Sequence, residues 1–168
     1  DRIQELTRRK EDLYNKVRTS AQLITNVRTV AAKEIEKQMQ AYLVPLGMPN
    51  VRFAVELTPR KEPDANGMDS VSFLFSANKN GTLQNVASIA SGGEIARVML
   101  SLKAMIAGAV KLPTIIFDEI DTGVSGKTAR KIGEKMREIS IGRQVLCVTH
   151  LAQIASLADN HLFIEKKT

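Results

Sequence analysis

Two adjacent carboxylates, Asp118 and Glu119, directly follow a short apolar run at residues 114–117. The run contains β-branched and aromatic side chains and follows Pro113, a pattern typical of a buried strand in a parallel sheet. Such sheets bind their ligands at the carboxyl ends of the strands, where two charges are costly unless a cation or a reactant meets them. Asp118 is therefore a candidate ligand of Mg²⁺, and Glu119 is a candidate base for a water that attacks a phosphate. The alternative is that both acids simply begin a loop or cap a helix.

A second candidate segment, Ser91-Gly92-Gly93-Glu94, stands directly before a run whose apolar residues recur at helical spacing: Ile95, Val98, Met99, Leu102, Met105 and Ile106. A small polar residue and two glycines at the start of a helix expose free backbone N–H groups at its positive end, which suits a phosphate. By itself, the segment is better explained as an N-cap followed by an acid in the first turn.

The third candidate is His150, which follows an apolar run at residues 144–149 that is typical of another strand. A single histidine is more often a structural residue than a ligand contact. The three signals are individually weak, but each lies at the end of a strand or the start of a helix. Their occurrence in this order within one short chain favours a common site.

Together, these segments resemble the signature, Walker B, D-loop and switch-histidine motifs of ABC-type ATPases. Within that superfamily, residues 90–97, 117–126 and 149–155 are similar to the RecN family of bacterial SMC-like DNA repair ATPases. The resemblance extends over essentially the whole chain, and the continuation Thr-Gly-Val-Ser-Gly at 122–126 distinguishes it from transporters and condensin-type heads. Ala90 departs from the leucine of many ABC proteins but not from RecN-like sequences.

The resemblance implies an α/β fold, namely the C-terminal lobe of an ABC-type ATPase head, with a parallel sheet, helices and an antiparallel edge. Residues 1–44 are expected to form a coiled-coil helix that enters the head, and residues 45–168 are expected to form the lobe. The first segment supports this independently, because its apolar residues follow one stripe and a helix of that length would measure about 60 Å. The alternative is a long helix packed on its own domain.

The resemblance also implies ATP and Mg²⁺ as cofactors, with ATP held between the Walker A motif of one head and the signature segment of a second. His150 would sense the γ-phosphate, and Asp121 would couple the two sites across the dimer. The expected residues are one metal ligand, two catalytic residues and five residues at the shared nucleotide site: Asp118; Glu119 and His150; and Ser91, Gly92, Gly93, Glu94 and Asp121.

The segment Gly126-Lys127-Thr128 superficially resembles a phosphate-binding P-loop. That loop requires a glycine five residues before Gly126, and the residue there is Asp121. We therefore interpret Lys127 as a solvated residue at the start of a helix. No other segment matches Walker A, so the chain is expected to be half of a head whose partners are the N-terminal half, a second head in an ATP-dependent homodimer, and DNA.

The remaining elements follow from simple patterns. Residues 51–57 and 71–75 alternate apolar and polar side chains, which predicts two antiparallel strands. The loop between them is expected to contain the turn-forming residues Pro59, Pro63, Asn66 and Gly67. Residues 151–158 are expected to form a short helix, and residues 161–164 a last strand of the sheet.

Composition bounds the function. The net charge of +6 and pI near 9.6 permit sequence-independent DNA contact, although an aromatic content of 4% argues against a base-stacking platform. No apolar run approaches the length of a membrane span. The single Cys147 excludes a disulfide within the chain, and we expect a bacterial, cytoplasmic, nucleoid-associated protein. The expected role is recombinational repair of DNA double-strand breaks; the alternative is a coiled-coil and dimerisation module without turnover.

Overall fold

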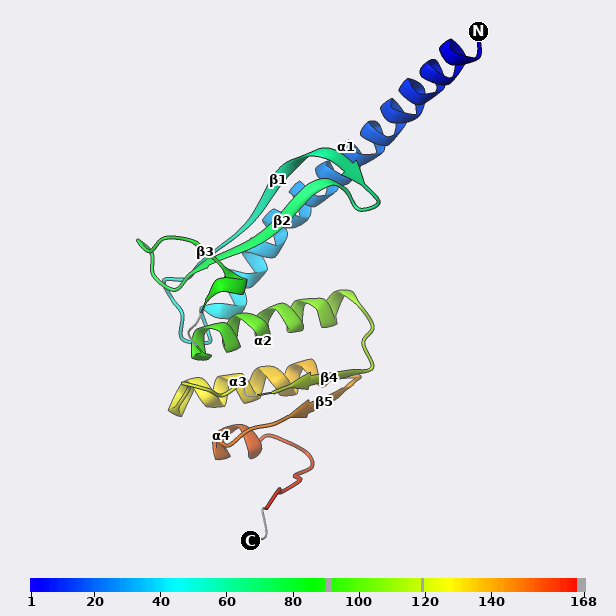
Figure 1. The fold of residues 1–168 in the computed structure, drawn as a ribbon. Coiled ribbons are helices and arrows are strands. Elements are labelled where there is room, and N and C mark those ends of the chain that lie inside the picture. Colours follow the sequence, from blue (N-terminus) through cyan, green and yellow to red (C-terminus); the bar gives the residue numbers. More distant parts are fainter. Residues whose placement is uncertain (90–91, 119, 166–168) are drawn as a thin grey trace.

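The computed structural model describes residues 1–89, 92–118 and 120–165, and Figure 1 shows their arrangement. The elements follow in this order: α1 Arg2–Leu43, β1 Arg52–Asp64, β2 Gly67–Ser76, β3 Gln84–Asn85, the 3-10 helix η1 Val86–Ser88, α2 Gly92–Ala109, β4 Thr114–Phe117, α3 Gly126–Ile139, β5 Gln144–Cys147 and α4 Ala152–Ala155.

The long helix α1 confirms that the first segment is helical, whereas its role in a coiled coil stays a prediction. It begins at Asp1, whose carboxylate accepts a hydrogen bond from the backbone N–H of Ile3, and it runs for 42 residues. Its N-terminal end extends beyond the rest of the molecule (Figure 1). The helix ends before a tight turn in which Gly47 adopts a left-handed φ of 84°, a conformation that suits glycine.

The hairpin of β1 and β2 lies along the C-terminal part of α1 (Figure 1). Both strands are antiparallel as predicted, with Phe53 opposite Phe75, but the predicted loop that begins at Pro59 is wrong. β1 instead continues to Asp64, with an irregularity in register between Pro59 and Asp64. Proline is tolerated there because β1 is an edge strand, on which a missing N–H donor can face away from the sheet.

The described strands form two separate sheets. One is antiparallel with the order β1-β2-β3, and the other is the parallel pair β4-β5. The expectation that the first two strands form an antiparallel edge of the parallel sheet therefore does not hold for the described residues. The helix α2 lies between α1 with its hairpin on one side and the β4-β5 pair on the other (Figure 1).

Two hydrophobic cores meet on α2. Its Val98 packs with Met39 and Leu43 from α1 and with Phe75 from β2. The opposite side of α2 supplies a second core with β4 and α3, which includes Leu100, Ala104, Phe117, Ile132 and Met136. Because α2 belongs to both cores, a displacement of this helix would disturb its packing against α1 and against β4. No helix among the described residues has both the length and the apolar character needed to cross a membrane.

The C-terminal segment differs from the sequence prediction. The helix after β5 contains only Ala152–Ala155, and the predicted strand at 161–164 is not formed. Leu162, Phe163 and Ile164 are 89–93% exposed. A strand needs a neighbour that accepts and donates its backbone hydrogen bonds, and no strand pairs with this segment in the described part of the chain.

Candidate functional site

The carboxyl ends of β4 and β5 create the edge at which the candidate residues gather. The strands are parallel, with Phe117 paired with Cys147, and the backbone N–H of Val148 donates to the Phe117 carbonyl at 2.9 Å. Residues that follow the two strands therefore emerge at the same edge of the sheet. Asp118 follows β4 directly, and His150 follows β5 after two residues.

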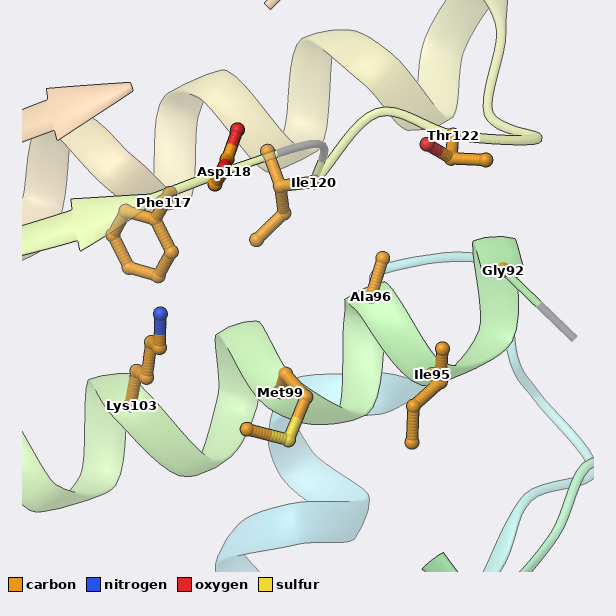
Figure 2. A pocket seen from close by; sticks show the side chains of 9 residues that line it. All are labelled: Gly92, Ile95, Ala96, Met99, Lys103, Phe117, Asp118, Ile120 and Thr122. Atoms are coloured by element: carbon orange, nitrogen blue, oxygen red, sulfur yellow. The ribbon is translucent and has the colours of Figure 1, made fainter. Parts of the chain in front are cut away.

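A groove of about 340 Å³ lies between β4 and the start of α2, and Figure 2 shows its lining side chains. Gly92 and Asp118 both line it, so two of the predicted segments share one surface. The ammonium group of Lys103 donates to the Ile116 carbonyl at 2.7 Å and lies 5.2 Å from the ring centre of Phe117. Lys103 thus joins α2 to β4 along one wall of the groove.

The two glycines at the start of α2 pack tightly against the loop that follows β4. A β-carbon on Gly93 would lie 2.8 Å from the carbonyl oxygen of Thr122 and 3.1 Å from that of Gly123. A β-carbon on Gly92 would lie 3.0 Å from the γ-methyl group of Thr122. Glycine at 93 is therefore required for close backbone packing within the chain, in addition to any exposure of N–H groups to a phosphate. No local sequence pattern indicates this role, since the partner residues lie in another segment.

The Oδ2 oxygen of Asp121 makes three contacts with the segment after β5. It accepts hydrogen bonds from the Thr149 hydroxyl and from the backbone N–H of His150 at 2.9 Å, and the His150 Nδ1 atom lies 3.2 Å away. The Asp121 side chain is 2% exposed, whereas the His150 side chain is 71% exposed. Asp121 and His150, which the sequence predicted as separate site residues, thus contact each other, with the carboxylate buried and the imidazole exposed.

The electrostatic state of Asp121 follows from these contacts. Burial by itself raises the pKa of the carboxyl group, but the hydrogen bonds from Thr149 and His150 outweigh burial, and the pKa of Asp121 lies below its ordinary value. Asp121 is therefore ionised at neutral pH. Its charge and that of Asp118 act on Cys147: burial first, then these two carboxylates, raise the pKa of the thiol to about 11. The thiol of Cys147 is accordingly protonated and unreactive at neutral pH.

The predicted site residues are thus distributed as follows. Gly92, Asp118, Asp121 and His150 lie around the carboxyl ends of β4 and β5 or the adjoining start of α2. Glu94 lies in the first turn of α2 and is partly buried. Ser91 and Glu119 lie outside the described residues. Thr149 is an additional functional candidate, because its hydroxyl donates to Asp121 while accepting the backbone N–H of Leu151 at 3.1 Å.

The donor set at this edge fits Mg²⁺ of the kind that nucleotides carry. Such an ion is usually held by one or two carboxylates, with water and phosphate oxygens completing its octahedral shell. Asp118 is an exposed carboxylate at the end of β4. Within the described ranges, no group of three or more histidine, cysteine or acidic residues forms a metal cage. Asp118 thus has the chemistry and the exposure that a ligand of such an ion would need.

The segment that resembles a P-loop has a different environment. Lys127 is exposed at the start of α3, as expected for a solvated residue. A β-carbon placed on Gly47 would lie 3.2 Å from the hydroxyl oxygen of Thr128, so Thr128 is close to the turn that follows α1. The start of α3 therefore lies against the turn that follows α1.

The chain resembles one group of curated proteins, although no protein-family model matches it. It is 41% identical over 171 residues to the DNA repair protein RecN of Halalkalibacterium halodurans, an alignment that covers 99% of the chain and 30% of that protein. It is 37% identical over 180 residues to the DNA repair protein RecN of Bacillus subtilis, with 98% of the chain and 31% of the relative covered. The chain thus spans slightly less than a third of the length of these relatives.

Solved structures resemble the chain in fold at lower sequence identity. The Smc head domain of Pyrococcus furiosus, which has an extended coiled coil and is bound to the C-terminal domain of ScpA, superposes with a TM-score of 0.61 at 20% identity over 94% of the chain and 40% of that structure. A structure from work on ATP-driven dimerisation and DNA-stimulated activation of SMC ATPases gives a TM-score of 0.57 at 18% identity, covering 84% of the chain and 83% of its own. The fold is therefore that of part of an SMC-type head, and by its sequence the chain belongs to the RecN family of DNA repair proteins.

Proposed function

We propose that the chain is the C-terminal part of the ATPase head of an SMC-like DNA repair protein. The observation that carries the proposal is the shared edge at the carboxyl ends of β4 and β5. Asp118, the Asp121–His150 pair and the glycine start of α2 lie around this edge, although they come from three separate segments. A carboxylate and an oriented imidazole suit a Mg²⁺-nucleotide held by the same head, and a helix N-terminus suits the phosphate of a nucleotide held by a second head.

Each residue then has a defined task. Asp118 would hold Mg²⁺, directly or through water, and the ion would supply positive charge that offsets the charge of the phosphates. Glu119 orients the attacking water and accepts its proton, and His150 contacts the γ-phosphate from the end of β5. These roles require a Walker A segment, which the sequence of this chain does not contain. The chain by itself is therefore expected to be inactive.

A second head completes the nucleotide site in this proposal. Ser91, Gly92 and Gly93 of one head cover the ATP held by the other, and the N-terminal end of the 18-residue helix α2 faces the γ-phosphate. ATP binding closes the dimer and hydrolysis opens it, which is a ligand-driven shift between two states. A structural neighbour studied for ATP-driven dimerisation and DNA-stimulated activation supports this extension.

The apolar surfaces of the chain support a complete head with a coiled coil. Ile116 on β4 and Val148 directly after β5 are 57% and 56% exposed, which leaves an apolar face for the N-terminal half of the head. On α1, Leu6 and Leu13 are 56% and 53% exposed at positions of one stripe, which suits an antiparallel helix of the same protein. Closing and opening of the heads would then move this coiled coil. Separately, the net charge of +6 favours DNA contact that does not depend on sequence. The resulting task is holding or bridging DNA ends during double-strand break repair in the bacterial cytoplasm.

The test uses the full-length protein with Glu119→Gln. This change preserves the shape of the side chain but removes the base, so ATP should bind with nearly unchanged affinity while turnover falls by about 10²-fold or more. The ATP-closed dimer should persist, as measured by light scattering. An exposed acid elsewhere, changed in Glu138→Gln, serves as the control and should alter neither quantity. Unchanged turnover in Glu119→Gln would contradict the proposed function and favour a structural module.

A further inference from the structure

Asp121 holds the segment of His150 in place by both its backbone and its side chain. The same oxygen accepts from the His150 backbone N–H at 2.9 Å and lies 3.2 Å from the Nδ1 atom of the imidazole. The carboxylate is buried and the imidazole is exposed, so the ring projects outward from a fixed base. One buried side chain thereby determines where His150 lies and which ring atom faces inward.

These contacts also determine which ring nitrogen carries the proton. A carboxylate can only accept hydrogen bonds, so the Nδ1 atom that faces Asp121 must be the donor. In the neutral imidazole, the Nε2 atom is then an acceptor, and it lies on the side of the ring away from Asp121. In its neutral form, His150 therefore presents an unprotonated Nε2 atom on the side of the ring away from Asp121.

Thr149 fixes the direction in which the hydrogen bonds to Asp121 run, from donor to acceptor. Its hydroxyl oxygen accepts the backbone N–H of Leu151 at 3.1 Å, so the single hydroxyl proton is free to be donated to Asp121. The chain of hydrogen bonds thus runs from Leu151 through Thr149 to Asp121. It ties the segment after β5 to the loop after β4 across 28 positions of sequence.

We propose that Asp121 is a positioning residue that acts through His150 of its own chain: it fixes the Nδ1–H tautomer of the neutral ring and directs Nε2 toward the nucleotide, where Nε2 donates to a phosphate oxygen when the ring is protonated. This inference rests on the proposed function for the identity of the phosphate, but the tautomer is independent of it. It differs from a direct contact of Asp121 with a second head, because the carboxylate is 2% exposed and its Oδ2 atom is occupied by donors of its own chain.

The spectroscopic test uses the full-length protein labelled with ¹⁵N at histidine, with the His150 signals identified by their loss in His150→Gln. The parent protein should show a protonated Nδ1 and an unprotonated Nε2 at high pH. Asp121→Ala should shift the neutral ring toward the Nε2–H tautomer, which predominates in free imidazole side chains. Asp121→Asn, which retains an acceptor oxygen, should partly restore the Nδ1–H form and also covers the case in which Asp121→Ala does not fold.

Asp69→Asn provides a matched control, because Asp69 is another buried carboxylate that accepts from a threonine hydroxyl, at 2.8 Å from Thr25. Asp69 contacts α1 and the hairpin, so its replacement should leave the His150 signals unchanged. An unchanged tautomer in Asp121→Ala and Asp121→Asn, or the same shift in Asp69→Asn, would overturn the inference.

Turnover provides the second readout. His150→Gln and Asp121→Ala should each lower kcat by about 10²-fold, with the KM for ATP changed less than about threefold. The double variant should be no slower than His150→Gln, because a residue that acts through another has no separate effect. Additive losses would overturn the inference, whereas a parent protein without turnover would contradict the proposed function and leave the tautomer measurement decisive.

Discussion

Asp69 and Asp121 are both buried, at 7% and 2% exposure, and each accepts a hydrogen bond from a threonine hydroxyl, that of Thr25 or of Thr149. Their second partners differ. Asp69 meets the guanidinium of Arg28 at 3.2 Å, while Asp121 meets the imidazole of His150. Arginine carries a permanent charge, whereas histidine gains and loses a proton near neutral pH.

The Arg28–Asp69 ion pair forms a joint between α1 and the hairpin, whereas Asp121 and His150 lie at the edge where β4 and β5 end. The Arg28 side chain is 28% exposed and also donates to the Asn66 carbonyl at 2.7 Å, so the ion pair connects α1 to the tip of the hairpin. The His150 side chain is 71% exposed and contacts Asp121 through its Nδ1 atom. The same kind of buried acceptor therefore fixes two elements together in one region and holds an exposed imidazole in the other.

The largest effect is expected from breaking the joint. Arg28→Met leaves the Asp69 carboxylate without its cation, and the free energy of unfolding should fall by about 2–3 kcal/mol after allowance for the partial exposure of Arg28. Urea denaturation of the full-length protein measures this loss. The control is Arg130→Met, which removes an ion pair with Glu134 whose side chains are 72% and 53% exposed, and the unfolding midpoint should stay nearly constant. Equal unfolding midpoints in the two variants would show that the Arg28–Asp69 ion pair does not hold α1 to the hairpin.

At the edge where β4 and β5 end beside the start of α2, the comparable test is Gly93→Ala. The new methyl group would lie 2.8 Å from a backbone carbonyl that cannot rotate away, so we expect a loss of about 1–3 kcal/mol. On the same helix, Gly108 has no atom within 4 Å of a β-carbon position, and Gly108→Ala should stabilise the protein by about 0.5–1 kcal/mol. Thermal unfolding of both variants provides the measurement. A stabilising Gly93→Ala would leave only the phosphate-binding explanation for this glycine.

The two threonines allow a matched comparison of the regions. Thr25→Val and Thr149→Val each remove a hydroxyl but preserve the side-chain shape, and each should cost about 1 kcal/mol of stability. Only Thr149→Val should lower ATP turnover, because only Thr149 supports the segment of His150. Parallel measurements of melting and turnover would separate the effects. A loss of turnover in Thr25→Val as great as in Thr149→Val would assign both networks a general structural role.

The smallest effect concerns Cys147, whose thiol pKa is raised first by burial and then by the charges of Asp121 and Asp118. Since its pKa is raised to about 11 from 9.0, the thiolate fraction at pH 8 should be about 10²-fold lower than in an ordinary cysteine, and alkylation should slow accordingly. Asp121→Asn removes one of the two carboxylate charges but not the burial, so the rate should rise while remaining below that of an exposed thiol. Asp69→Asn should have no effect. Mass spectrometry of the Cys147 peptide follows the reaction.

The sequence by itself determined the elements whose patterns are local. The stripe on α1, the apolar run before Asp118 and the helical spacing after Glu94 each depend on neighbours within a few turns or residues, and α1, β4 and α2 were all predicted correctly. The edge at which Asp118 and His150 gather was predictable for the same reason, because parallel strands place their carboxyl ends together. The order of motifs also indicated the family.

Tertiary structure alone decided the contacts between distant segments. Pro59 and Pro63 predicted a loop, but the edge position of β1 allowed the strand to continue to Asp64. The segment 161–164 has a strand-like pattern, yet it forms no strand because pairing requires a neighbour. Asp121 and Gly93 gained their roles only when the loop after β4 met His150 and the start of α2. No local pattern encodes these meetings, because they depend on how α2, β4 and β5 pack around a common core.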